Sequence, residues 1–203
     1  MTPRPNVSEQ RKNQILDAAM QVFARLGFHK ARMDDVAREA GVSKGLLYWY
    51  YKNKDALIAA ILDRLFSQEM GHLRQALVAP GPVSERLLAL GGETARHVLR
   101  LKFLAPIAFE FYALAGRNAH VRSALQRYYA QYRQNLTQLI EEGIASGEFR
   151  PDTQAETVAQ TIIALFEGLI LLWIVDPEQM PLAEQVEESF ALIVRSIRAG
   201  GDI

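Results

Sequence analysis

The spacing of apolar residues most constrains the fold of this chain, because that spacing has the helical period along nearly all 203 residues. Apolar side chains recur every three or four positions between short breaks that contain glycine or proline, and this period is typical of α-helices. No segment alternates apolar and polar residues convincingly, and no Asn-Gly or Asp-Gly pair marks a hairpin. We therefore predict an all-α fold of about nine helices.

The net charge of zero conceals two parts of opposite sign. Residues 1–55 hold ten Lys/Arg against six Asp/Glu, whereas residues 56–203 hold thirteen against seventeen. A basic segment attached to an acidic one favours a nucleic-acid-binding module joined to a module with another task. The chain has no cysteine, which excludes disulfides, thiolate metal sites and a cysteine nucleophile.

A helix-turn-helix pattern lies in the basic segment, over residues 36–51 (VAREAGVSKGLLYWYY). Ala37 is small enough for two helices to cross closely, and Gly41 stands where the turn calls for a positive φ. Ser43 stands at the expected N-cap of the second helix. In such a unit the second helix enters the DNA major groove.

The residues around this pattern resemble the N-terminal domain of the TetR family of bacterial transcriptional regulators. The likeness runs from about Arg11 to Leu57 and includes the segments around Ile15–Gly27, Val36–Ser43 and Gly45–Tyr51. It implies a DNA-binding three-helix domain over residues 1–55 and a helical ligand-binding and dimerisation domain over residues 56–203. Met33 and Leu46 depart from the family pattern, and neither side chain can donate a hydrogen bond.

Chemistry at the matched positions gives the expected DNA contacts. Lys44 can bind guanine or a phosphate, Leu46 can touch a thymine methyl group, and tyrosine hydroxyls can donate to phosphates. Tyr50 is equally compatible with a partly buried position. The predicted DNA-binding residues are Arg32, Lys44, Gly45, Leu46, Tyr48, Trp49, Tyr50 and Lys54.

The family resemblance implies that the last two long helices pair with their copies across a two-fold axis. Residues 153–175 are apolar most of the way round a helix, which requires burial on several sides. An internal core is the alternative. The predicted dimer-interface residues are Ile162, Leu165, Leu169, Trp173, Phe190 and Ile193.

Aromatic residues around Glu110, together with tyrosines on the following helix, suggest a pocket for a small, largely apolar or aromatic ligand. The alternative is that they form a packed core. The candidate ligand-binding residues are His97, Phe103, Ile107, Glu110, Phe111, Tyr128, Tyr132 and Phe166.

These features predict a cytoplasmic, dimeric regulator, by family resemblance a repressor, that leaves a palindromic operator when its ligand binds. The ligand would favour a conformation with badly spaced recognition helices. A nucleoid-associated or division-linked DNA-binding protein without a small-molecule switch is the second hypothesis. We expect no enzymatic activity, no cofactor and no metal, because the four histidines form no H-E-x-x-H motif and only one E-x-x-H occurs, at residues 69–72.

Overall fold

The structure is a computed structural model, and it describes residues 7–200. Over these residues the chain forms nine α-helices and one short 3-10 helix without a β-strand, so the prediction of an all-α fold is confirmed. Residues group into two compact units. The first comprises the described residues up to Phe66 together with Leu101–Gln126, and the second comprises Ser67–Arg100 with the described residues from Arg127 onward.

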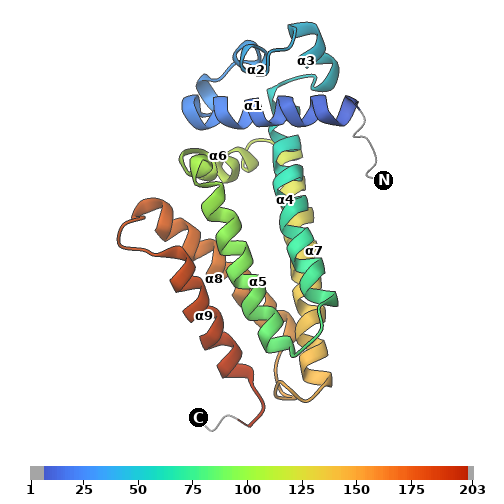
Figure 1. The fold of residues 1–203 in the computed structure, drawn as a ribbon, viewed down its shortest axis with the longest axis vertical. Coiled ribbons are helices and arrows are strands. Elements are labelled where there is room, and N and C mark those ends of the chain that lie inside the picture. Colours follow the sequence, from blue (N-terminus) through green and yellow to red (C-terminus); the bar gives the residue numbers. More distant parts are fainter. Residues whose placement is uncertain (1–6, 201–203) are drawn as a thin grey trace. The chain divides into compact units, whose positions relative to one another are not determined.

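The first unit is organised around helix α1 (Val7–Lys30), with α2 (Met33–Glu39) and α3 (Lys44–Tyr50) on one side and α6 (Ala105–Ala115) on the other (Figure 1). The 3-10 helix η1 (Lys102–Leu104) precedes α6. Helix α1 bends at Gly27, whose φ is +73°. Its buried face carries Ile15, Val22 and Phe23, which recur at helical spacing and form the centre of the core.

Helices α4 (Lys54–Val78) and α7 (Ala119–Ala145) each begin in the first unit and end in the second. The second unit also contains α5 (Val83–Arg100), α8 (Ala155–Val175) and α9 (Leu182–Ile197), and α9 packs against both α5 and α8 (Figure 1). The close approach of α9 to α5 depends on a glycine, because a Cβ on Gly91 would lie 2.7 Å from the Phe190 ring.

Two charged side chains with internal partners, Arg86 and Glu148, connect the start of α5 to the ends of α4 and α7. Arg86 is buried and forms a bidentate ion pair with Glu142, at 2.6 and 2.8 Å, while its Nε donates to the Ala76 carbonyl. The carboxylate of Glu148 accepts hydrogen bonds from the Val83 and Ser84 backbone N–H groups at the start of α5. A carboxylate at this end of a helix satisfies N–H groups that have no partner within the helix.

Helix α8 leaves an apolar face uncovered within the chain. Leu172 and Val175 expose 56% and 73% of their surface, and Leu171 is also exposed. The helix is long and apolar enough to cross a membrane by length and composition alone. An uncovered face of this kind indicates a contact with another molecule.

Candidate DNA-binding surface and candidate effector site

The turn between α2 and α3 has the conformation that the sequence predicts. Gly41 has a φ of +61°, and no atom lies within 4 Å of a Cβ built there, so the backbone conformation rather than crowding favours glycine. Ser43 caps α3, with its hydroxyl oxygen accepting from the Leu46 backbone N–H at 3.2 Å. Leu47 is fully buried beneath α3, which fixes the side of the helix that faces away from the protein.

The outer face of α3 combines aromatic and basic side chains. Trp49 is 73% exposed and Tyr48 is 41% exposed, and Lys44 and Gly45 are exposed beside them. Tyr50 is half-buried, and its ring meets that of Trp49 edge-on with centroids 4.7 Å apart. Leu46 is also half-buried, whereas Arg32, which precedes α2, is exposed. Seven of the eight predicted DNA-binding residues therefore lie on or next to α2 and α3.

Lys44 is paired with an acidic side chain of α2 in the free protein. Its ammonium lies 2.8 Å from Oδ1 of Asp34, and both side chains are more than half exposed. The carboxylate of Asp34 raises the pKa of Lys44, so the ammonium stays charged. An exposed pair of this kind contributes little to stability, and DNA phosphates can replace the partner.

The eighth predicted DNA contact, Lys54, is engaged by the protein backbone. Its ammonium donates to the carbonyl oxygens of Phe28, His29 and Ala31, in the turn that follows Gly27. Glu110 of α6 binds the same turn through a backbone N–H group. Its carboxylate accepts a hydrogen bond from the Phe28 N–H at 2.7 Å. One short turn between α1 and α2 is thus held by a cation and by an anion.

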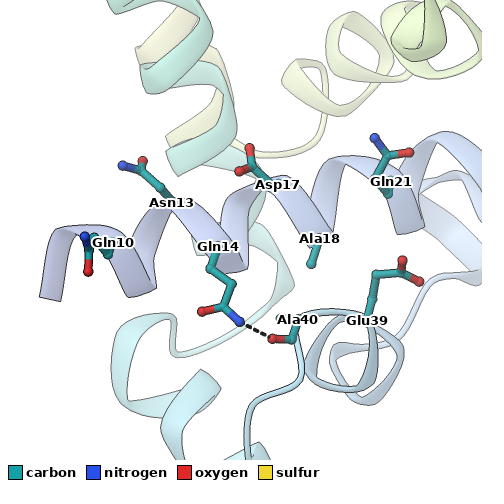
Figure 2. Close-up of a pocket in the computed structure, with 8 residues that line it drawn as sticks. All are labelled: Gln10, Asn13, Gln14, Asp17, Ala18, Gln21, Glu39 and Ala40. Atoms are coloured by element: carbon teal, nitrogen blue, oxygen red, sulfur yellow. Dashed lines mark hydrogen bonds between the residues drawn. The ribbon is translucent and has the colours of Figure 1, made fainter. Parts of the chain in front are cut away.

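A polar groove runs along α1 beside the α2–α3 turn, and Figure 2 shows the residues that line it. The Gln14 side chain donates a 2.6 Å hydrogen bond to the Ala40 carbonyl, at the end of α2. This bond satisfies a carbonyl at the helix C-terminus and fixes the turn to α1. Asp17 lines the same groove and forms an ion pair with Arg64 of α4 at 2.6 Å.

The candidate ligand-binding residues divide between the two units. Ile107 and Phe111 are buried in the first unit, where the Phe111 ring meets Phe28 edge-on at a centroid distance of 4.8 Å. Glu110 is engaged with Phe28 as described, and Phe103 is half-buried. The packing of these four residues is the packing expected if they form a core, which is the alternative to a ligand pocket. The other four residues, His97, Tyr128, Tyr132 and Phe166, belong to the second unit.

His97 belongs to a group of polar side chains of which the sequence predicted only His97 and Tyr132 as candidate ligand-binding residues. His97 and Glu69 are each only 9% exposed, and His97 Nε2 lies 3.6 Å from Glu69 Oε1. Among the described residues, neither Glu69 Oε2 nor His97 Nε2 has a hydrogen-bond partner. Burial raises the pKa of Glu69 to about 7 and lowers that of His97, so the carboxyl is half-protonated near neutrality and the imidazole is neutral.

Further polar groups from the same two helices, α4 and α5, and from α7 and α8 surround this pair. The Thr94 hydroxyl of α5 and the Glu167 carboxylate of α8 both act on the pKa of Glu69, the first lowering it and the second raising it. Burial raises the pKa of Tyr132 on α7, and so does the nearby Glu69 carboxylate. The ring of His72 meets that of His97 at 5.4 Å. We call this set the polar cluster; its members are Glu69, His72, Thr94, His97, Tyr132 and Glu167.

Tyrosines of α7 continue the polar cluster. Tyr129 donates a 2.6 Å hydrogen bond to Glu167, and the Tyr128 ring packs against both neighbours, 5.1 Å from Tyr129 and 5.6 Å from Tyr132. The E-x-x-H spacing of Glu69 and His72 was the available sequence signal, because it places both residues on one face of α4. Within residues 7–200, no three acidic, histidine or cysteine side chains are arranged to hold a metal ion.

Most of the predicted interface residues already pack within the chain. Ile162, Leu169, Trp173 and Phe190 are buried within the chain, so their side chains already pack internally, and Leu165 and Ile193 are half-buried. The helical period of α8 predicts burial on several sides, whereas within one chain a side of α8 that carries large apolar residues stays exposed. The large exposed apolar residues of α8 and α9 are Leu171, Leu172, Val175 and Leu192.

Comparison with known proteins gives two family matches. Residues 15–61 match the family of bacterial regulatory proteins, tetR family, and residues 104–197 match the C-terminal part of BetI-type transcriptional repressors. The chain is 30% identical over 171 residues to the uncharacterized HTH-type transcriptional regulator YhgD of Bacillus subtilis, covering 82% of this chain and 86% of that protein. It is 28% identical over 192 residues to the uncharacterized HTH-type regulator YfiR of the same species, covering 93% of this chain and 92% of YfiR.

Solved structures show the same fold. The transcriptional regulator FadR from Bacillus subtilis, in complex with stearoyl-CoA, superposes with a TM-score of 0.79 at 22% identity, covering 92% of this chain and 99% of FadR.

Proposed function

The chain belongs to the tetR family of bacterial regulatory proteins and is a DNA-binding transcriptional regulator, and we propose that it is a dimeric repressor released from its operator by a small molecule. We propose further that residues 1–55 bind DNA and that residues 56–203 take the ligand and form the dimer. The observation that carries the proposal is the outer face of α3, where aromatic and basic side chains are exposed above a buried Leu47.

On DNA, helix α3 enters the major groove with its N-terminal residues toward the base edges. Lys44 leaves Asp34 for a phosphate or a guanine, and Gly45 allows the backbone to approach closely. Tyr48 and Trp49 lie against the sugar-phosphate backbone, as does the hydroxyl of Tyr50, and Leu46 contacts a thymine methyl group at the edge of the helix. Arg32 adds electrostatic attraction. Lys54 supports this surface by holding the turn before α2, and its charge stands at the start of α4.

The dimer forms through the apolar face of α8 and the neighbouring part of α9. Its centre comprises Leu171, Leu172, Val175 and Leu192. The half-buried Leu165 and Ile193 contribute the part of their side chains that remains exposed. Ile162, Leu169, Trp173 and Phe190 support that face from inside the chain. A two-fold axis would present two α3 helices to major grooves about 34–36 Å apart, which suits a palindromic operator.

The ligand releases the operator through a coupling free energy between the effector site and the DNA-binding surface. A coupling of about 1–3 kcal/mol would weaken operator binding roughly 5- to 150-fold. Helix α4 is the natural connection, because it begins beside the DNA-binding helices and ends in the second unit. Of the residues suggested from sequence, His97, Tyr128, Tyr132 and Phe166 remain candidates for the effector site. The function requires no catalysis and no cofactor, and the protein acts in the cytoplasm where its DNA lies.

The experiment that tests the DNA proposal is selection of bound duplexes from a random pool. We expect enrichment of a palindrome whose half-site centres lie about one helical turn, or 10 base pairs, apart. Trp49→Ala and Lys44→Ala should weaken binding to the selected duplex, whereas the exposed controls Phe109→Ala and Lys102→Ala should not. Enrichment without any palindrome, or equal losses in the control variants, would reject the proposed arrangement.

A further inference from the structure

We propose that the polar cluster of the second unit binds the positively charged ammonium group of a small organic amine, with Glu69 as its ion-pair partner. The inference rests on the proposed function in one respect, since it places the effector in the second unit. It goes further by naming the chemical class of the ligand and the side chain that selects it.

The first argument is the lack of partners for two buried groups. Glu69 Oε2 and His97 Nε2 are both buried and both lack a hydrogen bond among the described residues. Buried polar groups in proteins nearly always have partners, and leaving one without a partner costs about 1–3 kcal/mol. Two such groups beside each other indicate a place where a ligand supplies the missing contacts.

The second argument is the sign of the charge. The carboxylate of Glu167 on α8 repels that of Glu69 and raises the pKa of Glu69. The neutral imidazole of His97 does not offset this repulsion, and Arg100 on α5 opposes it only in part. A cation beside Glu69 would relieve both the repulsion and the cost of burial, whereas a neutral hydrogen-bond donor brings no charge to offset the repulsion.

The third argument is the aromatic wall that α7 contributes. The Tyr128 ring contacts those of Tyr129 and Tyr132, and these two interact with the acidic groups: Tyr129 donates a hydrogen bond to Glu167, and the Glu69 carboxylate raises the pKa of Tyr132. An ammonium group is attracted to the faces of aromatic rings, and the attraction is larger where water is excluded. Acidic and aromatic groups together therefore favour an organic cation over a neutral apolar ligand.

A metal ion is a poorer occupant of this place. Glu69, His72 and His97 supply suitable atom types, but within residues 7–200 no three such side chains are arranged around a common point. Tight metal sites need ligand atoms at fixed short distances.

The test compares two probes of nearly equal shape, the 2-phenylethylammonium cation and the neutral 2-phenylethanol, by calorimetric titration of the full chain. We expect the cation to bind at least about tenfold more tightly. Glu69→Gln should remove most of that preference, because it takes away the charge and keeps the shape. The exposed Glu141→Gln, on α7, is the matched control and should leave the preference intact.

The pH dependence provides a second measurement. Because the pKa of Glu69 is about 7, the affinity for the cation should rise between pH 6 and pH 8, by up to about tenfold. His72, His97, Tyr132, Glu167 and Arg100 also surround the site, and a flat profile in Glu69→Gln would assign the change to Glu69 alone.

Equal binding of the two probes, or a preference that survives in Glu69→Gln, would overturn the proposal. Tighter binding of 2-phenylethanol would also overturn it, and would indicate a neutral ligand that accepts a hydrogen bond from the protonated Glu69 carboxyl. A chain that selects a palindromic duplex but ignores the cation would reject the ammonium site and leave the regulatory function standing.

Discussion

Two carboxylates, the half-buried Glu110 of the first unit and the buried Glu69 of the second, illustrate how differently this protein uses its acidic side chains. In the first unit, Glu110 accepts a 2.7 Å hydrogen bond from the Phe28 backbone and so completes a turn. In the second unit, Glu69 is buried, has one oxygen without a partner, and lies 3.6 Å from a neutral histidine. The first arrangement satisfies its carboxylate internally, whereas the second leaves it available to a ligand.

The difference shows why residue type alone does not locate a binding site. Both glutamates stand on helices among aromatic residues, and the sequence draws attention to Glu110 because four aromatic side chains surround it. The structure assigns Glu110 a backbone donor, and this removes the need for a cationic ligand there. Hydrogen-bond partners, rather than neighbours in sequence, separate a structural carboxylate from a functional one.

The largest expected effect is a change in the pH dependence of stability in Glu69→Gln. The folded-state pKa of about 7 lies above the ordinary value of 4.5, so the protonated carboxyl stabilises the protein below pH 4.5. That contribution is lost as the pH rises to 7, and the loss is about 3 kcal/mol. Urea unfolding at pH 4.5 and pH 8, at one protein concentration, should show a smaller decrease in Glu69→Gln than in the wild type.

His97 gives the opposite dependence, because its pKa is lowered and its contribution is lost as the pH falls below 6.5. Since His97 is present in both proteins, its effect cancels in the comparison. An equal pH dependence in both proteins would show that Glu69 is ionised in the folded state, and the contrast with Glu110 would disappear.

Glu110→Ala should have the next largest effect. It leaves the buried Phe28 backbone N–H without its acceptor, and we expect the free energy of unfolding to fall by about 2 kcal/mol. Glu110→Gln should be milder because its side-chain carbonyl can still accept. Chemical unfolding of these variants beside the exposed Glu141→Ala measures the difference. A loss in Glu141→Ala as large as in Glu110→Ala would contradict a specific role for this bond.

Lys54→Met should follow, with a loss of about 1.5 kcal/mol. The methionine keeps the aliphatic stem but removes the donor to the carbonyls of Phe28, His29 and Ala31. Lys52→Met is the matched control, since Lys52 is exposed two residues earlier. Thermal unfolding distinguishes the two. If Lys54→Met weakens operator binding while stability is unchanged, Lys54 acts on phosphate rather than on the turn.

The sequence was sufficient to predict the helices and the helix-turn-helix, because both depend on local patterns. Gly41 and Ser43 could be interpreted alone: one supplies a positive φ and the other caps α3. The polar cluster could not be found in this way, because Glu69, Thr94, Tyr132 and Glu167 come from four different helices. Only the packing of these helices brings the side chains together.

The interface residues show a related limit. The sequence indicated that α8 is apolar on several sides, but not which sides the chain covers itself. Phe190 packs against Gly91 of α5, and Leu172 and Val175 remain exposed, although all three positions look alike in sequence. Lys54 is a similar case, because a lysine at a helix start suits a phosphate and a set of carbonyls equally well.

The smallest expected effect on stability concerns Asp34→Asn, which removes the ion-pair partner of Lys44. Both side chains are more than half exposed and the pair is screened by solvent, so the free energy of unfolding should be almost unchanged. Operator affinity should nevertheless rise a few-fold at low salt, because the substitution releases the lysine and removes an anion from a surface that faces phosphates. Binding isotherms at several salt concentrations measure this, with Glu39→Gln, which releases Arg25 instead, as the matched control. An affinity that falls in Asp34→Asn would show that Asp34 orients Lys44 on a base, and the ion pair would then belong to recognition rather than compete with it.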